Sequence, residues 1–418
     1  MVVALDGTCL TVAQPTLRRE LGASVTEVQW TSTGYLVAVA GLLVFAGRLG
    51  DRYGHRRMFA VGMLGFGAAS AGLVAAPGIG WVIGLRVVQG VFGALLQPAT
   101  LGMLRAAYPP DRLRTPLAIR TAAIGVAAAT GPLVGGALAT AYGWRAVFVL
   151  TLAPTLAFGL LALLGRDDTP RPSPAPPLNL PGALLLAVTL GSLVHALVTL
   201  TAWTAALCAA TALAFAHHER RTPTPLLPPE VARSPAVRSG LAVLVAASAA
   251  VNGALFACVY LLQEDLGLTP FHSALVGAPL AVLLIGSAPV CAMSLKRAGS
   301  RRTTAGAVGL LAAGLSVLAA ASAPAVFGVG FALVGAGFGA VMVAGTHVVV
   351  KEAPVAVAGV AGGLQQTAMN VGPALGVAGA SLLMTAEGGR APLVVLAALM
   401  VGVVPVCRGL PGRGELRG

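Results

Sequence analysis

Two charged side chains and one amide lie inside apolar segments of the sequence, where a polar group is costly to bury. Asp6 falls in the first apolar segment, and Arg86 and Gln89 fall in the fourth. A carboxyl group held away from water favours its protonated form, so Asp6 could load and release a proton. Arg86 stays protonated; with Gln89 on the same helical face, it could order a polar network around a carboxylate. We therefore take Asp6, Arg86 and Gln89 as candidates for proton coupling or ligand recognition.

Each of these residues also has a structural interpretation. Asp6 could lie at the mouth of a short first helix, in contact with water. Arg86 is about five residues from Trp81 and could extend to the membrane interface. The first apolar segment has no basic residues before it and contains Asp6, which argues against a cleaved signal peptide.

Other polar residues of the apolar segments are weaker candidates. We expect His195 to be structural, although its titration range would suit a proton relay. Glu264 and Asp265 end an apolar segment, where they could cap a solvated loop or attract cations. Three neutral residues of the second half could line a central cavity or join helices, namely Asn252, Gln365 and Asn370.

The composition excludes an ordinary soluble globular protein. The 418-residue chain is 57% hydrophobic and only 10% charged. It has too few polar residues to form the surface of a soluble protein with so large a core. Apolar runs of about 18–25 residues recur, the length that crosses a bilayer as a helix. They do not alternate in polarity, which favours helices over a barrel. We predict fourteen transmembrane helices, at residues 2–17, 28–46, 58–76, 80–104, 117–140, 146–165, 180–200, 202–217, 239–262, 273–295, 304–322, 325–349, 356–385 and 390–407.

The predicted helices group as six, two and six. A Pro-rich segment, DDTPRPSPAPP at 167–177, follows the sixth helix. The predicted domains are a six-helix bundle over 1–165, a linker with two inserted helices over 166–236, a second six-helix bundle over 237–407 and a tail over 408–418. The fold class is therefore an all-α membrane protein.

The basic residues predict the orientation. If the loop at 47–57 is cytoplasmic, 22 of the 27 Lys and Arg residues, Arg120 among them, lie on the cytoplasmic side. Four lie on the other side, and Arg86 lies within a helix. All four tryptophans fall at the starts of helices that enter from the outer side, where amphipathic rings prefer to lie. Both termini are then predicted to be cytoplasmic.

Several function classes are disfavoured by what the sequence contains. The net charge of +13 is dispersed over short loops without a basic domain, which argues against nucleic-acid binding. The five cysteines lie singly in apolar segments, without the spacing of a metal site. We find neither a nucleotide-binding loop nor a nucleophile arrangement. We therefore expect no enzyme activity, no metal and no cofactor, with an ion gradient as the source of energy.

The segment GRLGDRYGHRR at 47–57 concentrates charge between two apolar runs. Its glycines permit a tight turn, Asp51 can accept hydrogen bonds from a helix N-terminus or an arginine, and the arginines favour the cytoplasm. The segment could instead be a topology signal only, but that would not require Asp51. The candidate residues are Gly47, Arg48, Gly50, Asp51, Arg52, Gly54, Arg56 and Arg57.

Two sequence features recur in the second half and indicate a duplication. SLKRAGSRR at 294–302 is a basic turn between the second and third helices of that half, without the acidic residue. GVAAATGPLVGGAL at 125–138 and TAMNVGPALGVAGA at 367–380 share a Gly-Pro followed by spaced small residues. Small residues permit close helix packing, which we expect of Gly131, Pro132, Gly135 and Gly136.

Together these motifs resemble the major facilitator superfamily, in particular its fourteen-helix drug:proton antiporter branch. GRLGDRYGHRR is similar to the superfamily's signature loop. LDGTCLTVAQP (5–15), GLRVVQGVFGA (84–94), TGPLVGGAL (130–138) and WRAVFVLTLAP (144–154) are similar to motifs of the branch, and YLLQEDLGLTPFHSALVGAP (260–279) resembles its ninth-helix exit. Thr11 and Thr151 stand where the branch usually has asparagine.

The resemblance implies a proton-coupled efflux transporter of lipophilic or cationic drugs that works by alternating access. It implies that the 47–57 segment latches the two halves on the cytoplasmic side and that the Gly131–Gly136 motif is associated with antiport. The alternatives are an exporter dedicated to one natural product, an importer, or a non-transporting membrane receptor. We expect a monomer in the bacterial cytoplasmic membrane, with a small lipophilic substrate, protons and lipid as partners.

Overall fold

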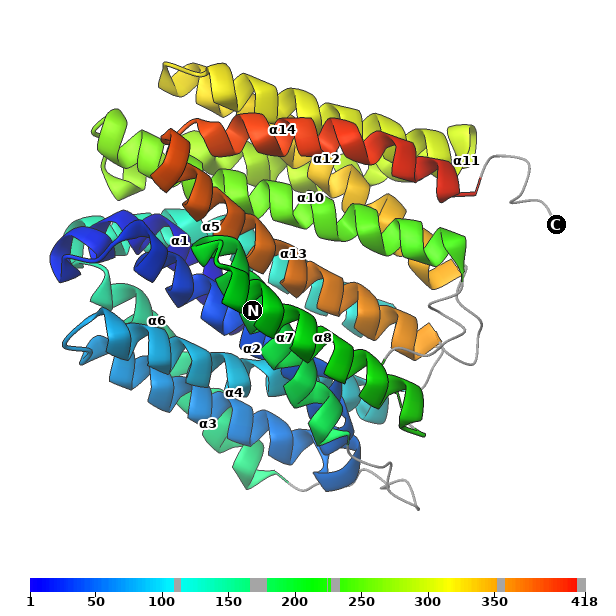
Figure 1. The fold of residues 1–418 in the computed structure, drawn as a ribbon. Coiled ribbons are helices and arrows are strands. Elements are labelled where there is room, and N and C mark those ends of the chain that lie inside the picture. Colours follow the sequence, from blue (N-terminus) through cyan, green and yellow to red (C-terminus); the bar gives the residue numbers. More distant parts are fainter. Residues whose placement is uncertain (109–113, 166–178, 224, 227–233, 352–357, 412–418) are drawn as a thin grey trace. The chain divides into compact units, whose positions relative to one another are not determined.

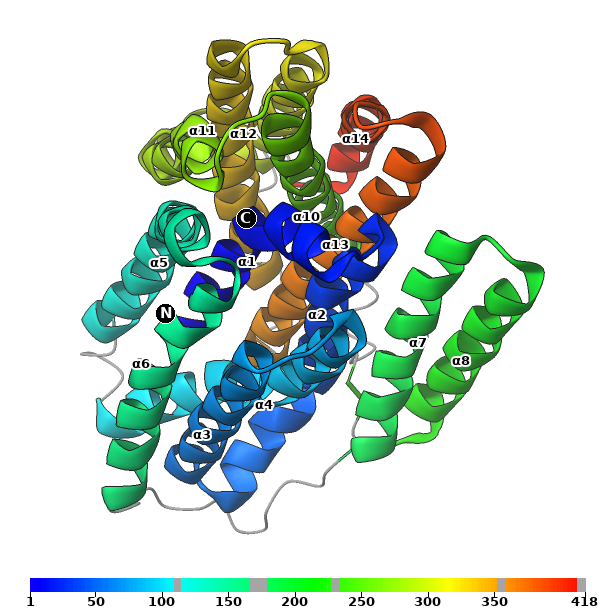
Figure 2. The ribbon, with the colours of Figure 1, turned by 90° about the vertical axis from the view of Figure 1, so that its left-hand side faces the viewer.

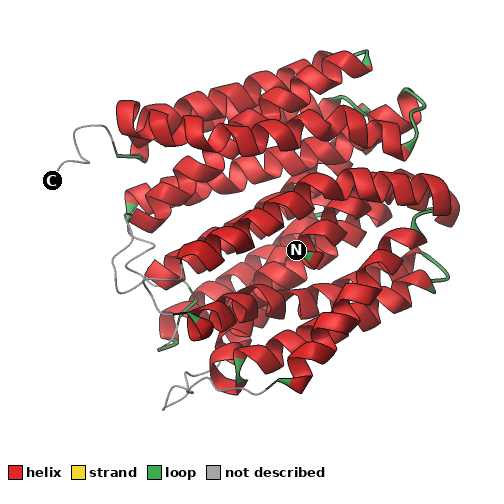
Figure 3. Cartoon of the chain, turned by 180° about the vertical axis from the view of Figure 1, so that it is seen from behind, coloured by secondary structure: helices red, strands yellow, loops and turns green. Residues whose placement is uncertain are grey.

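The computed structural model describes residues 1–108, 114–165, 179–223, 225–226, 234–351 and 358–411, and these residues are almost entirely helical (Figures 1 and 3). Ten of the described helical segments are long and apolar enough to cross a membrane. The predicted all-α membrane fold is confirmed. The predicted Pro-rich linker at 167–177 lies outside the described residues.

The chain divides into two compact units, Met1–Leu226 and Leu227–Gly418. The helices of the first unit are α1 (Val2–Leu21), α2 (Val25–Tyr53), α3 (His55–Val74), α4 (Ile79–Ala107), α5 (Arg114–Tyr142), α6 (Arg145–Leu164), α7 (Leu180–Thr199) and α8 (Ala202–Arg221). The helices of the second are α10 (Pro235–Tyr260), with a π-helical turn at Leu261–Asp265, α11 (Pro270–Ala320), α12 (Pro324–Lys351), α13 (Ala358–Glu387) and α14 (Ala391–Val403), with a 3₁₀ turn at Val404–Gly409.

Local sequence explains several helix starts. Ser24 and Glu27 form a reciprocal capping box at the start of α2, which satisfies two backbone donors at once. The side chains of Ser234 and Thr269 accept hydrogen bonds from the first turns of α10 and α11, and a proline follows each of them. Proline is favoured there because the first turn does not need its missing N–H.

The same helix pairs pack together in both units, as a duplicated bundle requires. In the first unit α1 packs against α5, α4 packs between α2 and α3, and α3 packs against α6. In the second unit α10 packs against α13, and α11 packs against α12 and α14. Because α11 consists of two helices joined at Gly299, it takes the places of both α2 and α3. The described helices are consistent with the predicted order of six, two and six, and the grouping itself remains a prediction.

The two inserted helices belong to the first compact unit. α7 and α8 pack against each other as a hairpin (Figure 2), and α7 packs against α2. The contact with α2 is close, since a Cβ atom at Gly41 would overlap the backbone and side chain of Ala187. The functional boundaries at 165 and 237 remain a prediction.

The predicted loop at 47–57 is wrong in extent, because the chain turns from α2 into α3 within one residue. α2 continues to Tyr53 and α3 begins at His55, so Gly54 alone separates them. Gly54 has a φ of 98°, a conformation that only glycine adopts without strain. The predicted basic turn at 294–302 is likewise helical on both sides of Gly299, whose φ is 78°. Each of the two glycines turns the chain within one residue, so the residues on both sides of it remain helical.

Candidate functional site

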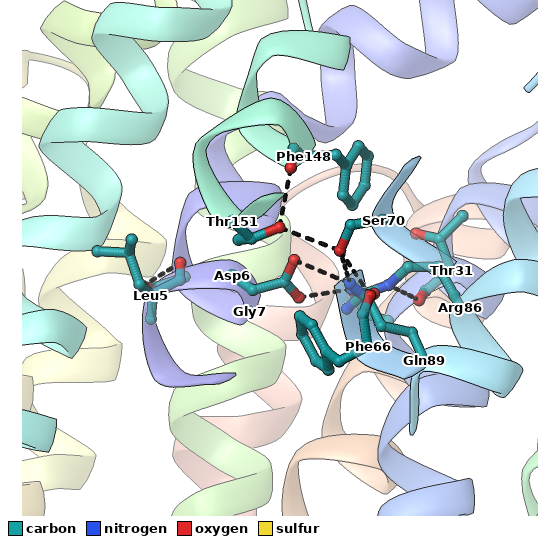
Figure 4. Close-up of polar contacts among 12 residues, drawn as sticks. Leu5, Asp6, Gly7, Thr31, Phe66, Ser70, Arg86, Gln89, Phe148 and Thr151 are labelled. Atoms are coloured by element: carbon teal, nitrogen blue, oxygen red, sulfur yellow. Dashed lines mark hydrogen bonds and ion pairs between the residues drawn. The ribbon is translucent and has the colours of Figure 1, made fainter. Parts of the chain in front are cut away.

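The three candidate residues of the first apolar segments meet inside the first unit (Figure 4). Arg86 Nη1 of α4 donates a hydrogen bond to Asp6 Oδ2 of α1 at 2.6 Å, and it also donates to Gln89 Oε1. Gln89 Nε2 lies 3.4 Å from Asp6 Oδ1. The exposed fractions of Asp6 and Arg86 are 1% each, so neither lies at a water-filled mouth or reaches an interface.

Neutral groups from three further helices extend this network. Gln89 Nε2 donates to Ser70 Oγ of α3 at 2.8 Å, and Thr151 Oγ1 of α6 donates to the same oxygen at 3.0 Å. Arg86 Nε donates to the backbone oxygen of Thr31 in α2 at 3.0 Å. The buried network therefore joins α1, α2, α3, α4 and α6, as Figure 4 shows.

Two aromatic rings cover the guanidinium group. Arg86 Cζ lies 4.5 Å from the ring centroid of Tyr35 and 6.0 Å from that of Phe148. The negative face of an aromatic ring attracts a cation, and more strongly where water is excluded. The Tyr35 hydroxyl is buried, and no hydrogen-bond partner is present for it among the described residues. Arg86 is thus held by ionic, hydrogen-bonding and aromatic contacts together.

The arrangement is a buried ion pair held in place by neutral hydrogen-bonding groups. The carboxylate of Asp6 is stabilised by its partner, and protonating it would leave Arg86 buried without a counter-ion. Loss of one partner from a buried ion pair costs about 3–5 kcal/mol. Removing either charge alone would therefore destabilise the interior that holds the pair.

The glycine motif of α5 packs directly on α1. A Cβ atom at Gly131 would overlap the Thr8 side chain, and one at Gly135 would lie 2.5 Å from Cys9 Cα. Cys9 Sγ also contacts the Gly131 backbone oxygen at 3.0 Å. Pro132 lies inside α5, and Gly136 is buried beside it. The motif therefore brings α5 against the helix that carries Asp6.

The second unit repeats this contact between its own helices. A Cβ atom at Gly372 of α13 would overlap Ser248 of α10, and one at Gly376 would overlap the Ala249 backbone oxygen. Gly372, Pro373 and Gly376 have the spacing of Gly131, Pro132 and Gly135. The shared Gly-Pro pattern thus performs the same packing in both units.

The charged segment at 47–57 makes contacts within the first unit. Asp51 Oδ1 lies 3.1 Å from His55 Nε2, so it contacts a histidine rather than the predicted arginine or helix N-terminus. Arg56 donates to the backbone oxygens of Ala162 and Leu161 at the end of α6, at 2.9 and 3.2 Å. These contacts tie α3 to the last turn of α6.

The other residues of this segment contact glycines, rings and the inserted hairpin. The His55 ring lies where Cβ atoms of Gly50 and Gly102 would be, and Gly47 faces Pro98. Arg52 lies 5.6 Å from the Tyr53 ring. Arg48 interacts electrostatically with Glu219 at the end of α8. Arg57 is exposed. The latch role of the segment remains a prediction.

The polar residues of the second unit bond mainly to their own or adjacent helices. Asn252 Nδ2 donates to the Ser248 backbone oxygen, and Asn370 Nδ2 donates to the Gln366 backbone oxygen, both at 2.9 Å. Gln365 Nε2 of α13 donates to Thr346 Oγ1 of α12 at 3.0 Å. Their predicted role in lining a cavity remains a prediction.

The remaining histidine and acidic candidates lie apart from this network. His195 of α7 lies between two tryptophan rings, 6.3 Å from Trp30 and 6.1 Å from Trp203. Glu264 and Asp265 are exposed in the π-helical turn after α10. These positions fit the structural interpretation of all three residues.

Sequence reasoning missed several residues that surround the candidates. Ser70 and Thr31 are neutral residues in apolar runs, where nothing marks them as network members. Arg120, which the basic-residue pattern predicts to lie on the cytoplasmic side, is in the second turn of α5. Its position inside the predicted helix 117–140 was the signal that could have identified it.

Comparison with known proteins gives the family. The model of the Major Facilitator Superfamily matches residues 1–377. The chain is 36% identical to the tetracenomycin C resistance and export protein of Streptomyces glaucescens, over 99% of this chain and 82% of the relative. It is 34% identical to a puromycin resistance protein of Streptomyces alboniger, over 94% and 82%. It is 29% identical to the multidrug efflux pump LfrA of Mycolicibacterium smegmatis, over 92% and 79%.

Solved structures support the fold. A peptide transporter POT in complex with sulfate matches 98% of this chain and 96% of its own, with a TM-score of 0.70 and 20% identity. A bacterial homologue of the human lysosomal transporter Spinster matches 98% and 95%, with a TM-score of 0.69 and 16% identity. These structures share the fold, and the family model over residues 1–377 together with the relatives at 36% and 34% identity shows that the chain belongs to the Major Facilitator Superfamily.

Proposed function

We propose that this chain is a proton-driven efflux transporter that exports a lipophilic small molecule across the bacterial cytoplasmic membrane. The observation that carries the proposal is the buried network of Asp6, Arg86 and Gln89 in a chain of this superfamily. An ionisable pair buried at membrane depth is costly, so it is expected to serve transport. The relatives named for resistance and export support the direction of transport.

An exporter dedicated to one antibiotic is the more specific form of this proposal. The relatives named for tetracenomycin C and puromycin are 36% and 34% identical to the chain, whereas the multidrug pump LfrA is 29% identical. These identities favour self-resistance to a single natural product. Multidrug efflux is the second candidate, supported by the likeness to LfrA over 92% of the chain.

In the proposed cycle, Asp6 alternates between an ion pair and a protonated state. With Asp6 ionised, the network holds α1 against α4 through Arg86. A proton on Asp6 removes the charge that balances Arg86, and the two helices then lose their strongest polar connection. Because α5 packs on α1 through Gly131 and Gly135, a movement of α1 would carry α5 with it. Substrate and proton would thereby favour different arrangements of the bundle.

The remaining features of the proposal follow from the sequence. Both termini are placed in the cytoplasm, because this orientation puts most of the basic residues on that side. The proton gradient supplies the energy, no cofactor is required, and the working unit is a monomer. The partners are a small lipophilic substrate, protons and the surrounding lipid.

Export assays in an efflux-deficient bacterium test the proposal. Cells expressing the wild type should expel lipophilic compounds of a test panel that includes acidic, neutral and cationic members, and a protonophore should abolish that export. Asp6→Asn should reduce export at least tenfold while the protein still reaches the membrane. Glu20→Gln is the matched control, since Glu20 also lies on α1 but is exposed and pairs with Arg145.

Three results would contradict the proposal. Export that continues with the protonophore would exclude proton drive. The absence of any gradient-dependent flux, together with indifference to Asp6→Asn and to Asp51→Asn, would favour a non-transporting receptor. Accumulation in place of expulsion would favour an importer.

A further inference from the structure

The buried charges of the chain constrain the charge of the compound that it exports, an inference that rests on the proposed function. Within the described ranges, two charged side chains are buried, Asp6 and Arg86. They pair with each other at 2.6 Å, and Gln89 contacts both. The buried pair is therefore neutral as a whole, and the carboxylate of Asp6 already has a cationic partner.

The other carboxylates of the described chain lie at or near helix ends. Six of them are exposed, namely Glu20, Glu27, Asp51, Glu264, Asp265 and Glu387. The seventh, Glu219, lies at the end of α8 and interacts with Arg48. The Oε1 atom of Glu219 is buried, but Arg48 already compensates that charge, as Arg86 compensates Asp6.

The second unit contributes only neutral polar groups to its described interior. These are Ser248, Gln263, Ser273, Ser300, Thr304, Asn370 and Ser381. Among the described residues, a lipophilic cation could gain a buried counter-ion only by taking Asp6 from Arg86 or Glu219 from Arg48. Either exchange would leave an arginine without its counter-ion, which offsets the benefit of the new contact.

Arg120 adds a positive charge that the described residues do not balance. It lies in the second turn of α5 and is half-buried, and its Nε atom is buried without a hydrogen-bond partner. Among the described residues no carboxylate pairs with it. α5 packs against α1, so Arg120 lies on a helix in contact with the one that carries Asp6.

We propose that the exported compound is a lipophilic acid and that Arg120 binds its acidic group. The chemical class is an apolar molecule with a carboxylic acid, or with an equally acidic phenol or enol, that is ionised at neutral pH. The planar guanidinium group presents paired donors that match the two oxygens of such a group. Both the neutral Asp6–Arg86 pair and the unbalanced Arg120 disfavour a lipophilic cation.

Equilibrium binding to the full chain in lipid nanodiscs tests this assignment without a proton gradient. Two probes of matched shape are compared by calorimetry, anthraquinone-2-carboxylate and 2-(trimethylammoniomethyl)anthraquinone. The carboxylate should bind to the wild type at least tenfold more tightly than the cation. Arg120→Gln should abolish most of that difference, and Arg120→Lys, which keeps the charge, should retain part of it. Arg145→Gln, which removes an exposed arginine paired with Glu20, should not change it.

The inference is wrong if the carboxylate binds no more tightly than the cation, including the case in which neither binds. It is also wrong if folded Arg120→Gln keeps the full preference, or if Arg145→Gln removes it equally. Its failure can be distinguished from failure of the proposed function. Export of cations that is lost in Asp6→Asn would keep the function and exclude the lipophilic acid. Selective binding of the carboxylate without energy-dependent export would support the lipophilic acid and exclude the proposed function.

Discussion

Asp6 and Arg86 are each tolerable in the apolar interior because the other is present. Their contact of 2.6 Å is supported by Gln89 and by the rings of Tyr35 and Phe148. A buried ion pair contributes little net stability when compared with apolar residues of the same volume, yet a single remaining charge is strongly destabilising. The pair therefore acts as a unit. The losses of unfolding free energy caused by substituting each residue alone should not add up in the double variant.

A double-mutant cycle on this pair measures that dependence. Arg86→Met should lower the unfolding free energy by about 3–5 kcal/mol at neutral pH, because it leaves the Asp6 carboxylate buried without a counter-ion. Asp6→Asn combined with Arg86→Met should recover a large part of the loss, since no buried charge then remains. Denaturant unfolding of the purified variants in detergent checks this. Losses that simply add would show that the two residues do not interact.

At the scale of residues, the sequence identifies the charged members of the buried network well and the small neutral members poorly. Asp6 and Arg86 are conspicuous because a charge in an apolar run is rare and costly. Ser70 and Thr151 are small polar residues that also occur singly on lipid-facing surfaces. Their place in the network depends on how α3 and α6 are rotated against α4, which no local pattern in one helix specifies.

At the scale of helices, the contact between α1 and α5 depends on glycines that allow the two backbones to approach closely. Gly131 and Gly135 leave no room for a Cβ atom, and the Cys9 thiol contacts a backbone oxygen of α5. Small residues are the main means of close helix packing in lipid, where no hydrophobic effect drives helices together. The position of Asp6 relative to its neighbours is therefore set partly by α5.

Substitution of Gly135 should separate α1 from α5. Gly135→Ala places a Cβ atom 2.5 Å from Cys9 Cα, so one helix must shift. Overpacking of this kind costs about 1–3 kcal/mol, and export should fall with stability. Gly84→Ala is the matched control, because a Cβ atom there would have nothing within 4 Å and alanine favours a helix by about 0.5–1 kcal/mol. Thermal unfolding distinguishes them; equal shifts of the same sign would contradict the packing argument.

The helix boundaries were predicted less completely than the helices themselves. The apolar runs gave the order of the elements, but charged residues at 47–53 and 294–298 were assigned to loops. These residues are helical because α2 and the first part of α11 extend beyond their apolar runs, up to Gly54 and Gly299. Charge shows where a helix leaves the apolar layer, whereas backbone conformation decides where it ends.

At the scale of the whole molecule, the two units are variations on one bundle. Both pack their first helix on their fifth through a Gly-Pro motif, and both turn between their second and third helices at one glycine. The turns also share a sequence pattern, Arg-x-Gly-x-Arg-Arg, at 52–57 and 297–302. The duplication predicted from two short motifs therefore extends to backbone geometry.

The paired glycine turns predict matched effects in the two units. Gly54→Ala and Gly299→Ala each force a side chain onto a backbone conformation with positive φ that L-residues rarely adopt, which should cost about 1–3 kcal/mol. Because the two positions lie in different units, the losses should add in the double variant. Unfolding in denaturant measures all three. A double variant that loses no more than one single variant would show that only one of the turns contributes to stability.

The one-residue turn at Gly54 also affects how a protease meets the native chain. A protease binds its substrate as an extended segment of several residues, and between Val25 and Val74 the backbone offers only Gly54 outside a helix. The arginines on either side are therefore poor sites for trypsin, despite their number and their charge. Cleavage there requires one end of α2 or α3 to unwind first, so its rate reports the local opening of this corner.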